Sequence, residues 1–117
     1  MARIGTTRWV SGKQEAYIAK LLGAKQTVNS GAAHYNCGDI ISEDWLFEAK
    51  STLSEKKSFS IKKEWLEKNE RERKDAQKSY SSLVFQFAPD GENYFVIPEK
   101  TFKIMYEVFN SYGKDNN

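Results

Sequence analysis

The sequence predicts a single α/β domain with one central mixed β-sheet flanked by helices. Its 117 residues suit one domain, and a 14% share of aromatic residues is enough to build a core. Strand-like apolar runs and helical apolar patterns follow each other along the chain. The predicted order is one helix, three short strands, a helix, two strands and a last helix, which is typical of a mixed α/β domain.

The first helix is expected at residues 12–22, after an N-terminal arm at residues 1–10. Ser11 can serve as its N-cap, because serine oxygen accepts a hydrogen bond from the first free backbone N–H groups. Gly23 suits its end, since glycine adopts the left-handed conformation that closes many helices. This stretch is therefore the first structured element of the predicted domain.

The inward face of this helix should carry Ile18, Ala19 and Leu22. Glu15 precedes these residues by three, four and seven positions, which are the spacings of one helical face. We therefore expect the Glu15 carboxylate at the edge of the apolar face. The simpler alternative is a first-turn glutamate that is favoured by the helix dipole.

The remaining elements follow from apolar periodicity and turn residues. The stretch at 67–75, EKNERERKD, contains no apolar residue, so we expect that half of its helix to face solvent or a partner. The last helix should turn Phe102, Met105, Tyr106 and Phe109 inward. Strands are expected at residues 26–28, 37–42, 45–51, 82–88 and 94–98, helices at 61–79 and 100–111, and a frayed tail at 113–117.

Three charged residues, Asp39, Glu48 and Lys50, lie in what should be a buried hairpin. If Glu43-Asp44 forms a two-residue turn, Asp39 faces Glu48 across the two strands and Lys50 lies one pleat further along the same face. Like charges that oppose each other destabilise a sheet. The sequence therefore predicts a compensating positive group at this position.

A divalent metal is the strongest candidate, because Mg²⁺ takes carboxylate oxygens and water as ligands and leaves positions open for phosphate. The Ala49 carbonyl could add a ligand, and Glu15 could complete the site directly or through water. Lys50 could then orient a nucleophilic water or stabilise charge on phosphorus, which suits phosphodiester hydrolysis. In the alternative reading, Lys50 only neutralises Glu48, and Asp39 is an ordinary turn residue.

Basic residues are unevenly distributed although the net charge is only +2. Residues 56–78 contain nine lysines and arginines against five acids, a local excess of four. Such a stripe can follow a phosphate backbone, although a solvated helix with i,i+4 ion pairs explains it equally well. The candidates for phosphate contact are Arg3, Arg8 and Lys13 near the N-terminus, Lys56 and Lys57 before the second helix, and Lys62 at its start.

The spacing of the charged residues resembles the PD-(D/E)XK nuclease motif. Asp39 is followed by eight residues and then by Glu48-x-Lys50, with Gly38 where the motif has proline. With Glu15 upstream on a helix, the order resembles the Holliday junction resolvase branch, which includes archaeal-type and phage-encoded enzymes. The resemblance has motif support over residues 12–51, and beyond that it depends on element order.

The resemblance implies a restriction-endonuclease-like fold and a role for each motif residue. Asp39 and Glu48 would bind Mg²⁺ or Mn²⁺, Lys50 would act on the attacking water, and Glu15 would support metal or water. Ser30 would contact the phosphate backbone near the scissile bond. Ser51, which follows the motif lysine, and the basic residues would add DNA contacts.

The resemblance also implies a homodimer that acts on four-way junction DNA, because such a junction is two-fold symmetric and needs two matched cuts. Two other readings stay open. One is another PD-(D/E)XK nuclease, such as a nickase, a repair enzyme or a restriction-like enzyme. The other is a non-catalytic DNA- or protein-binding module in which the charges are structural.

Several classes of protein are disfavoured. A single cysteine, Cys37, allows no internal disulfide, and one cysteine with one histidine gives no zinc-binding spacing. No apolar run approaches the ~20 residues of a membrane span, and the N-terminus lacks the apolar stretch of a signal peptide. We therefore expect a cytoplasmic protein, in the host cytoplasm if it is phage-encoded, with no membrane partner.

Overall fold

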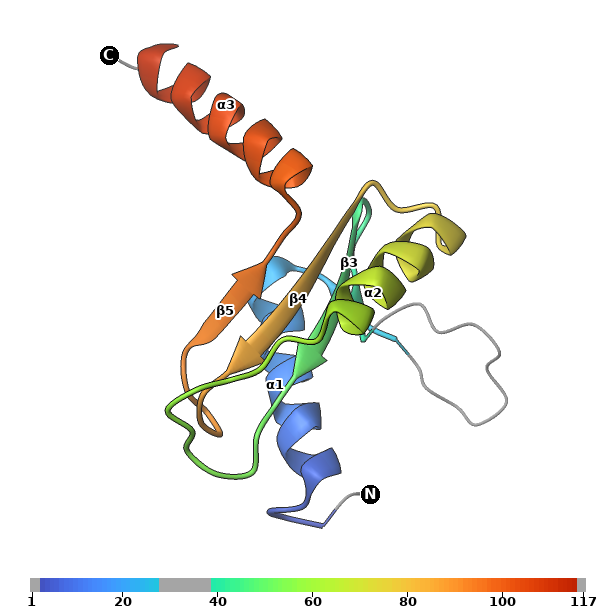
Figure 1. Cartoon of the computed structure of the whole chain (residues 1–117), viewed down its shortest axis with the longest axis vertical. Coiled ribbons are helices and arrows are strands. Elements are labelled where there is room, and N and C mark those ends of the chain that lie inside the picture. The colour runs from blue at the N-terminus through green and yellow to red at the C-terminus, as the bar shows by residue number, and fades with distance from the viewer. Residues whose placement is uncertain (1–2, 28–38, 116–117) are drawn as a thin grey trace.

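The computed structural model describes residues 3–27 and 39–115 and confirms the predicted α/β class (Figure 1). Five strands form one sheet, and three helices accompany it. In chain order, the elements are α1 (Thr7–Leu22), β1 (Lys25–Gln26), β2 (Ile40–Ile41), β3 (Trp45–Lys50), α2 (Lys63–Asp75), β4 (Tyr80–Gln86), β5 (Asn93–Val96) and α3 (Glu99–Asp115).

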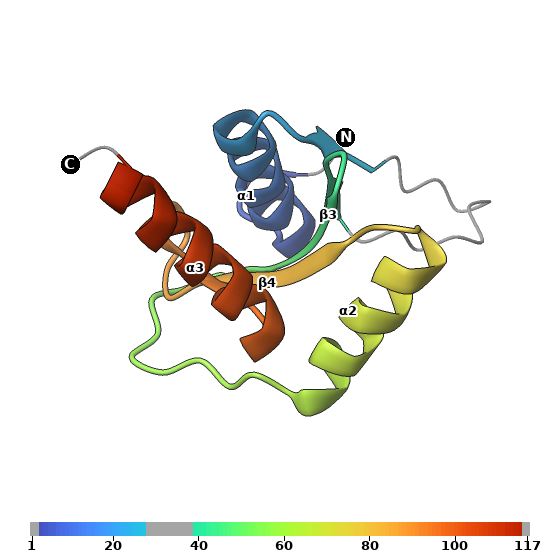
Figure 2. The same ribbon diagram turned by 90° about the horizontal axis from the view of Figure 1, so that it is seen from above.

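The sheet is mixed, as the sequence predicts, and its strands lie in the order β1-β2-β3-β4-β5. β3 and β4 are parallel, and every other neighbouring pair is antiparallel. Parallel neighbours require a crossover connection, and α2 supplies it. α1 and α2 lie on opposite sides of the sheet (Figure 2), so side chains of β3 alternate between contact with one helix and contact with the other.

The predicted hairpin register is confirmed. Ile41 pairs with Leu46 and Ile40 pairs with Phe47, which is the register expected from a two-residue turn. β2 covers only residues 40–41 of the expected range 37–42. Residues 37–38 lie outside the described part of the chain. β1, expected at residues 26–28, lies at residues 25–26, and residue 28 is outside the described part of the chain.

α1 begins five residues earlier than predicted, so the expected arm at residues 1–10 is wrong for residues 7–10. Thr6 is the N-cap, and its hydroxyl oxygen accepts a hydrogen bond from the Trp9 N–H at 3.3 Å. Ser11 is inside the helix, where its hydroxyl donates to the Arg8 carbonyl at 3.1 Å. The predicted cap, Ser11, is therefore wrong, because Thr6 satisfies the same kind of free N–H group five residues earlier.

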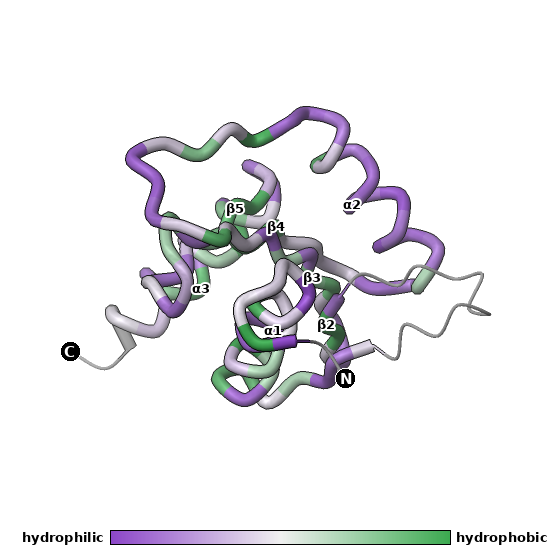
Figure 3. The backbone as a smooth tube through the Cα atoms, turned by 90° about the horizontal axis from the view of Figure 1, so that it is seen from below, coloured by the Kyte–Doolittle hydropathy of each residue, from purple (hydrophilic) through white to green (hydrophobic). Residues whose placement is uncertain are grey.

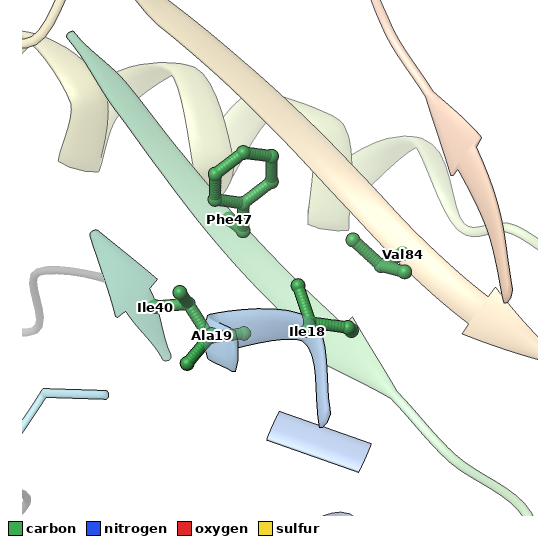
Figure 4. Packing of buried hydrophobic residues seen from close by; sticks show 5 residues of the cluster. All are labelled: Ile18, Ala19, Ile40, Phe47 and Val84. Atoms are coloured by element: carbon green, nitrogen blue, oxygen red, sulfur yellow. The ribbon is translucent and has the colours of Figure 1, made fainter. Parts of the chain in front are cut away.

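The core lies between α1 and the sheet. Ile18 and Ala19 of α1 pack against Ile40, Phe47 and Val84 from three neighbouring strands (Figure 4). The prediction was wrong for Leu22, which is 44% exposed. Leu22 is the last residue of α1, where the chain has already turned toward Gly23 and β1.

α2 differs most from its prediction. It begins at Lys63 and ends at Asp75 instead of covering residues 61–79, so Ile61 precedes it, and Leu66 inside it is 36% exposed. The polar stretch faces solvent on one side only. Asn69 and Glu72 are buried where α2 packs against β3 and β4. Figure 3 shows α2 as an almost wholly hydrophilic helix beside the sheet.

α3 extends to Asp115, so residues 113–115 of the expected frayed tail are helical. Its four predicted inward residues, Phe102, Met105, Tyr106 and Phe109, are all exposed, by 47% to 76%. Within the described chain, α3 makes at most marginal contact with the other helices and strands. It projects away from the end of β5 (Figure 1). The inward orientation is therefore contradicted, because no layer formed by residues 3–27 and 39–98 covers these four side chains.

Two glycines of α1 allow a matched test of the helix boundaries. Gly23 has a φ of 63° and closes the helix, whereas Gly12 is inside it, and a Cβ at either position would meet no atom within 4 Å. Gly23→Ala should lower the free energy of unfolding by about 1 kcal/mol, and Gly12→Ala should raise it by ~0.5–1 kcal/mol. Urea denaturation followed by circular dichroism measures both. Equal effects of the two substitutions would contradict the assigned helix boundaries.

Candidate active site

Asp39 is held against β3 by backbone geometry. Its N–H donates at 2.9 Å to the carbonyl of Phe47, the residue that faces Ile40, so Asp39 departs from the regular β2–β3 register. Its Oδ2 accepts a hydrogen bond from the Ala49 N–H at 2.8 Å. These two contacts bring the Asp39 carboxylate near the Glu48 carboxylate, although Asp39 lines the hollow beside α1 and Glu48 lines a second hollow beside α2.

Burial and like charge shift the protonation of this pair. Burial and the charge of Asp39 raise the pKa of Glu48 to about 7, against the smaller opposing effects of Lys68 and Lys50. Burial also raises the pKa of Asp39, although the Ala49 N–H and Lys50 lower it in part. Both groups therefore resist ionisation in the folded protein, and a positive charge placed between them would remove that resistance.

α1 brings Glu15 to the same place from the other side of the sheet. Burial raises the pKa of Glu15 to about 7, and the charge of Asp39 contributes to the shift. A hydrogen bond with the Gln26 side chain opposes it. Glu15 and Asp39 both line an open hollow of about 1060 Å³, so Glu15 lies where the helical spacing predicted, at the border of the apolar face.

Gln14, the residue before Glu15 in α1, holds the helix in its rotation about its own axis. This side chain is 2% exposed, and its Nε2 donates to the Lys50 carbonyl at 3.0 Å and to Asn93 Oδ1 at 3.1 Å. The helix is thereby joined to the ends of β3 and β5. Gln14 was not among the predicted site residues, so sequence reasoning missed this contact.

Lys50 lies on the α2 side of β3, on the same face as Glu48. Its ammonium group is 4.3 Å from the centre of the Trp65 ring on α2, a cation–π contact that holds the side chain in place. Lys62 approaches the same ring at 5.7 Å. Glu48, Lys50 and Trp65 line a second hollow of about 310 Å³. Lys50 is therefore available beside the carboxylate pair, as predicted.

Two residues of α2 were missed as members of the site. The Lys68 ammonium lies 3.9 Å from a Glu48 carboxylate oxygen and 3.6 Å from one of Glu72. The i,i+4 spacing of Lys68 and Glu72 could have indicated their mutual contact. Their proximity to Glu48 could not be read from the sequence, because it depends on how the polar face of α2 packs against β3.

The predicted DNA-binding residues fall into separate groups. Arg8 and Lys13 line the hollow that contains Glu15 and Asp39, and Lys13 also forms an ion pair with Asp90 at 3.2 Å. Lys62 approaches the site through Trp65, and Ser51 directly follows β3. Ser30 lies outside the described residues. Arg3, Lys56 and Lys57 are exposed in loops, and none of them lines either hollow beside the carboxylates.

Asp39 and Glu48 carry carboxylate oxygens, the ligand type that Mg²⁺ takes. Within residues 3–27 and 39–115, no group of three or more His, Cys, Asp or Glu side chains is arranged to hold a metal ion. Mg²⁺ does not need such a group, because one or two carboxylates with water and substrate phosphate are its usual ligands. Asp39 and Glu48 supply that pair. The Ala49 carbonyl stays a predicted ligand.

Protein-family models, curated proteins and solved structures give no match to this chain. No helix in the described part of the chain is long and apolar enough to span a bilayer. The chemistry of the site is therefore argued from the geometry of its own residues, and the likeness to the PD-(D/E)XK motif stays a prediction.

The raised pKa of Glu48 predicts a pH-dependent stability. Between its ordinary value of 4.5 and about 7, the folded protein keeps a proton that the unfolded chain releases. The metal-free protein should therefore lose stability as the pH rises through this window, by about 2 kcal/mol from Glu48 after allowance for partial exposure. Glu48→Gln should flatten this decline. Urea denaturation at a series of pH values measures it.

The matched control is Glu107→Gln, which removes an exposed carboxylate from α3. It should leave the pH dependence of the wild type unchanged. Parallel stability curves for the wild type and Glu48→Gln from pH 4.5 to 8 would contradict the assigned protonation of the pair.

Proposed function

We propose that this chain is a metal-dependent endonuclease that hydrolyses DNA phosphodiesters, with four-way junctions as its substrate. One observation carries the proposal: Asp39 and Glu48 lie side by side across the hairpin, with Lys50 on the same face of β3. The approach of Glu15 from α1 supports it. This arrangement agrees with the sequence resemblance to the PD-(D/E)XK resolvases.

Asp39 and Glu48 would hold Mg²⁺ or Mn²⁺, with Glu15 in support beside Asp39. Such a cation lowers the pKa of a water molecule and offsets the charge of the phosphate group. The Lys50 ammonium, kept beside Glu48 by Trp65, would orient the attacking water or stabilise the negative charge that develops on phosphorus. The same residues therefore provide binding, orientation and charge stabilisation.

The DNA would approach along the hollows that flank the carboxylates. Arg8 and Lys13 line one hollow, and Lys68 lines the other. Basic side chains on both sides of an acidic pair can hold the phosphates that flank a scissile bond. Phosphate contacts carry no sequence information directly, so we propose recognition of DNA shape. Paired cuts in a two-fold symmetric junction would need a homodimer, acting in the cytoplasm.

A non-catalytic DNA-binding module is the second candidate, and one observation favours it. Lys68 already lies near Glu48, and the Lys50 ammonium rests on Trp65. The charges could therefore be neutralised within the protein and serve only its stability. This reading predicts DNA binding without cleavage and no special effect of Mg²⁺.

Asp39→Asn should abolish cleavage of a synthetic four-way junction in Mg²⁺ while junction binding is kept or strengthened, because a negative charge near the phosphates is removed. The metal-free variant should also unfold at a higher temperature than the wild type, since two opposed carboxylates are relieved. Gel electrophoresis of end-labelled strands reports cleavage, and circular dichroism reports unfolding.

A linear duplex of the same sequence and an EDTA reaction are the controls. Metal-dependent, symmetric nicks in the junction alone support a resolvase, and nicks in both substrates support a nuclease without junction specificity. An uncut junction in both Mg²⁺ and Mn²⁺ would reject the nuclease and leave the binding module.

Loss of a basic side chain beside the site should change the salt dependence of binding. Arg8→Ala and Lys13→Ala should each reduce the slope of log K against log salt concentration by about 0.9, the value for one lost phosphate contact. Fluorescence anisotropy with a labelled junction measures the slope. Lys103→Ala, on the polar side of α3, is the control and should leave the slope unchanged. Equal slopes for all three variants would place the DNA elsewhere on the protein.

A further inference from the structure

Trp9 differs from the other tryptophans, because its ring meets no other aromatic ring among the described residues. The ring of Trp45 stacks on that of Phe47 with centres 5.6 Å apart, and the ring of Trp65 lies 6.4 Å from that of Phe59. Trp9 is also absent from the buried cluster that α1 forms with the sheet. Neither ring stacking nor the main core therefore accounts for a large aromatic side chain at this position.

Trp9 lies in the wall of the open hollow that contains Glu15 and Asp39. It precedes Glu15 by six residues, which is about 9 Å along the axis of α1. Figure 1 shows the first turns of this helix projecting past the end of β3. The hollow measures about 1060 Å³, and small-molecule sites commonly measure about 300–1,000 Å³, so a nucleotide has room beside the carboxylates.

Two basic residues of α1 accompany the indole ring. The Lys13 ammonium lies 4.6 Å from the centre of the Trp9 ring, and Arg8 lines the same hollow. The first turn of α1 contains no acidic residue, so the positive end of the helix dipole is not neutralised there. An aromatic ring with cations beside it suits single-stranded nucleic acid, because a base stacks on the ring while the cations meet the phosphates.

Small residues keep the helix surface open next to the ring. Gly12 and Ala16 follow Trp9 by three and seven positions, so the three residues lie along one side of α1, and all of them line the hollow. A Cβ at Gly12 would meet no atom within 4 Å. A recess is therefore present beside the indole ring, where a flat base can approach the helix backbone.

We propose that this hollow binds an unpaired nucleotide at the branch point of DNA, with its base stacked on Trp9. Bases inside a duplex are stacked on their neighbours, so a protein ring gains a base face only where a base has left the stack. The favoured substrates are consequently branched DNAs with single-stranded nucleotides, such as forks and flaps.

The position of the base relative to the cut rests on the function proposed above, whereas the binding of the base does not. A stacked strand advances 3.4 Å per nucleotide. The 9 Å between Trp9 and Glu15 therefore corresponds to about three nucleotides. The nuclease would cut within that distance of the unpaired base.

The first test measures binding in EDTA by fluorescence anisotropy, so that no cleavage is needed. Trp9→Ala should raise the dissociation constants of a labelled oligothymidine and of a labelled fork by about tenfold, the typical effect of losing one stacked base. Trp9→Phe should retain most of the affinity, because an aromatic face remains. The dissociation constant of a fully paired duplex should not change. Circular dichroism should show that the variants are folded.

The matched control is Tyr17→Ala, which removes an exposed aromatic side chain of the same helix that does not line the hollow. It should bind every DNA as the wild type does. Gly12→Leu tests the recess with Trp9 intact, because leucine would fill the space beside the ring and should weaken oligothymidine binding. A fork that carries 5-iododeoxyuridine at the unpaired position should cross-link to Trp9 on irradiation, and peptide mass spectrometry locates the attachment.

Several outcomes would overturn the proposal. They are a wild type that binds no oligothymidine, a Trp9→Ala protein that loses duplex and oligothymidine affinity equally or keeps both, and cross-links that form only at other residues. A junction that is cut in Mg²⁺ by a protein without affinity for oligothymidine would reject the Trp9 site and keep the nuclease. Binding and cross-linking at Trp9 without any cleavage would keep the Trp9 site and reject the nuclease.

Discussion

The register of the β2–β3 hairpin is the constraint on which the candidate site depends. A shift by one residue would turn Glu48 and Lys50 from the α2 side of the sheet to the α1 side. The observed pairing of Ile41 with Leu46 instead leaves Asp39 and Glu48 in contact. This arrangement lowers the free energy of unfolding at neutral pH, because two buried carboxylates that resist ionisation oppose folding. Burial of Ile40 and Phe47 in the core beside them offsets that cost.

The second constraint is the crossover that makes β3 and β4 parallel. It requires α2 to lie on the face that carries Glu48, opposite α1. This face is therefore shared by an apolar patch around Leu46 and Leu83 and by the polar group of Glu48, Lys68 and Glu72. Glu72, one of the two buried residues of α2, meets the Lys68 ammonium there, whereas Asn69 Oδ1 has no hydrogen-bond partner among the described residues.

Local patterns in the sequence predicted the fold class, the order of elements and the hairpin register, because turn residues and period-two alternation determine these locally. They failed for the start of α1, where Thr6 and Ser11 are equivalent caps by local criteria. They also failed for α2 and α3, whose environments depend on distant strands. Of the candidate site, Asp39, Glu48 and Glu15 followed from spacing, whereas Lys68 required knowledge of which side of α2 meets the sheet.

Gln14 adds polar contacts between α1 and the sheet to the apolar contacts of Ile18 and Ala19. Its amide connects α1 to the Lys50 carbonyl and to Asn93, and the next residue is Glu15. The Gln14 contacts therefore set the angle at which Glu15 approaches Asp39. An insertion of one residue between Gln14 and Glu15 would turn Glu15 by about 100° around the helix axis. Exposed positions of α1 such as Tyr17 and Leu21 can change residue type without moving Glu15. The spacing between Gln14 and Glu15 cannot change, just as the two-residue spacing between Glu48 and Lys50 cannot change.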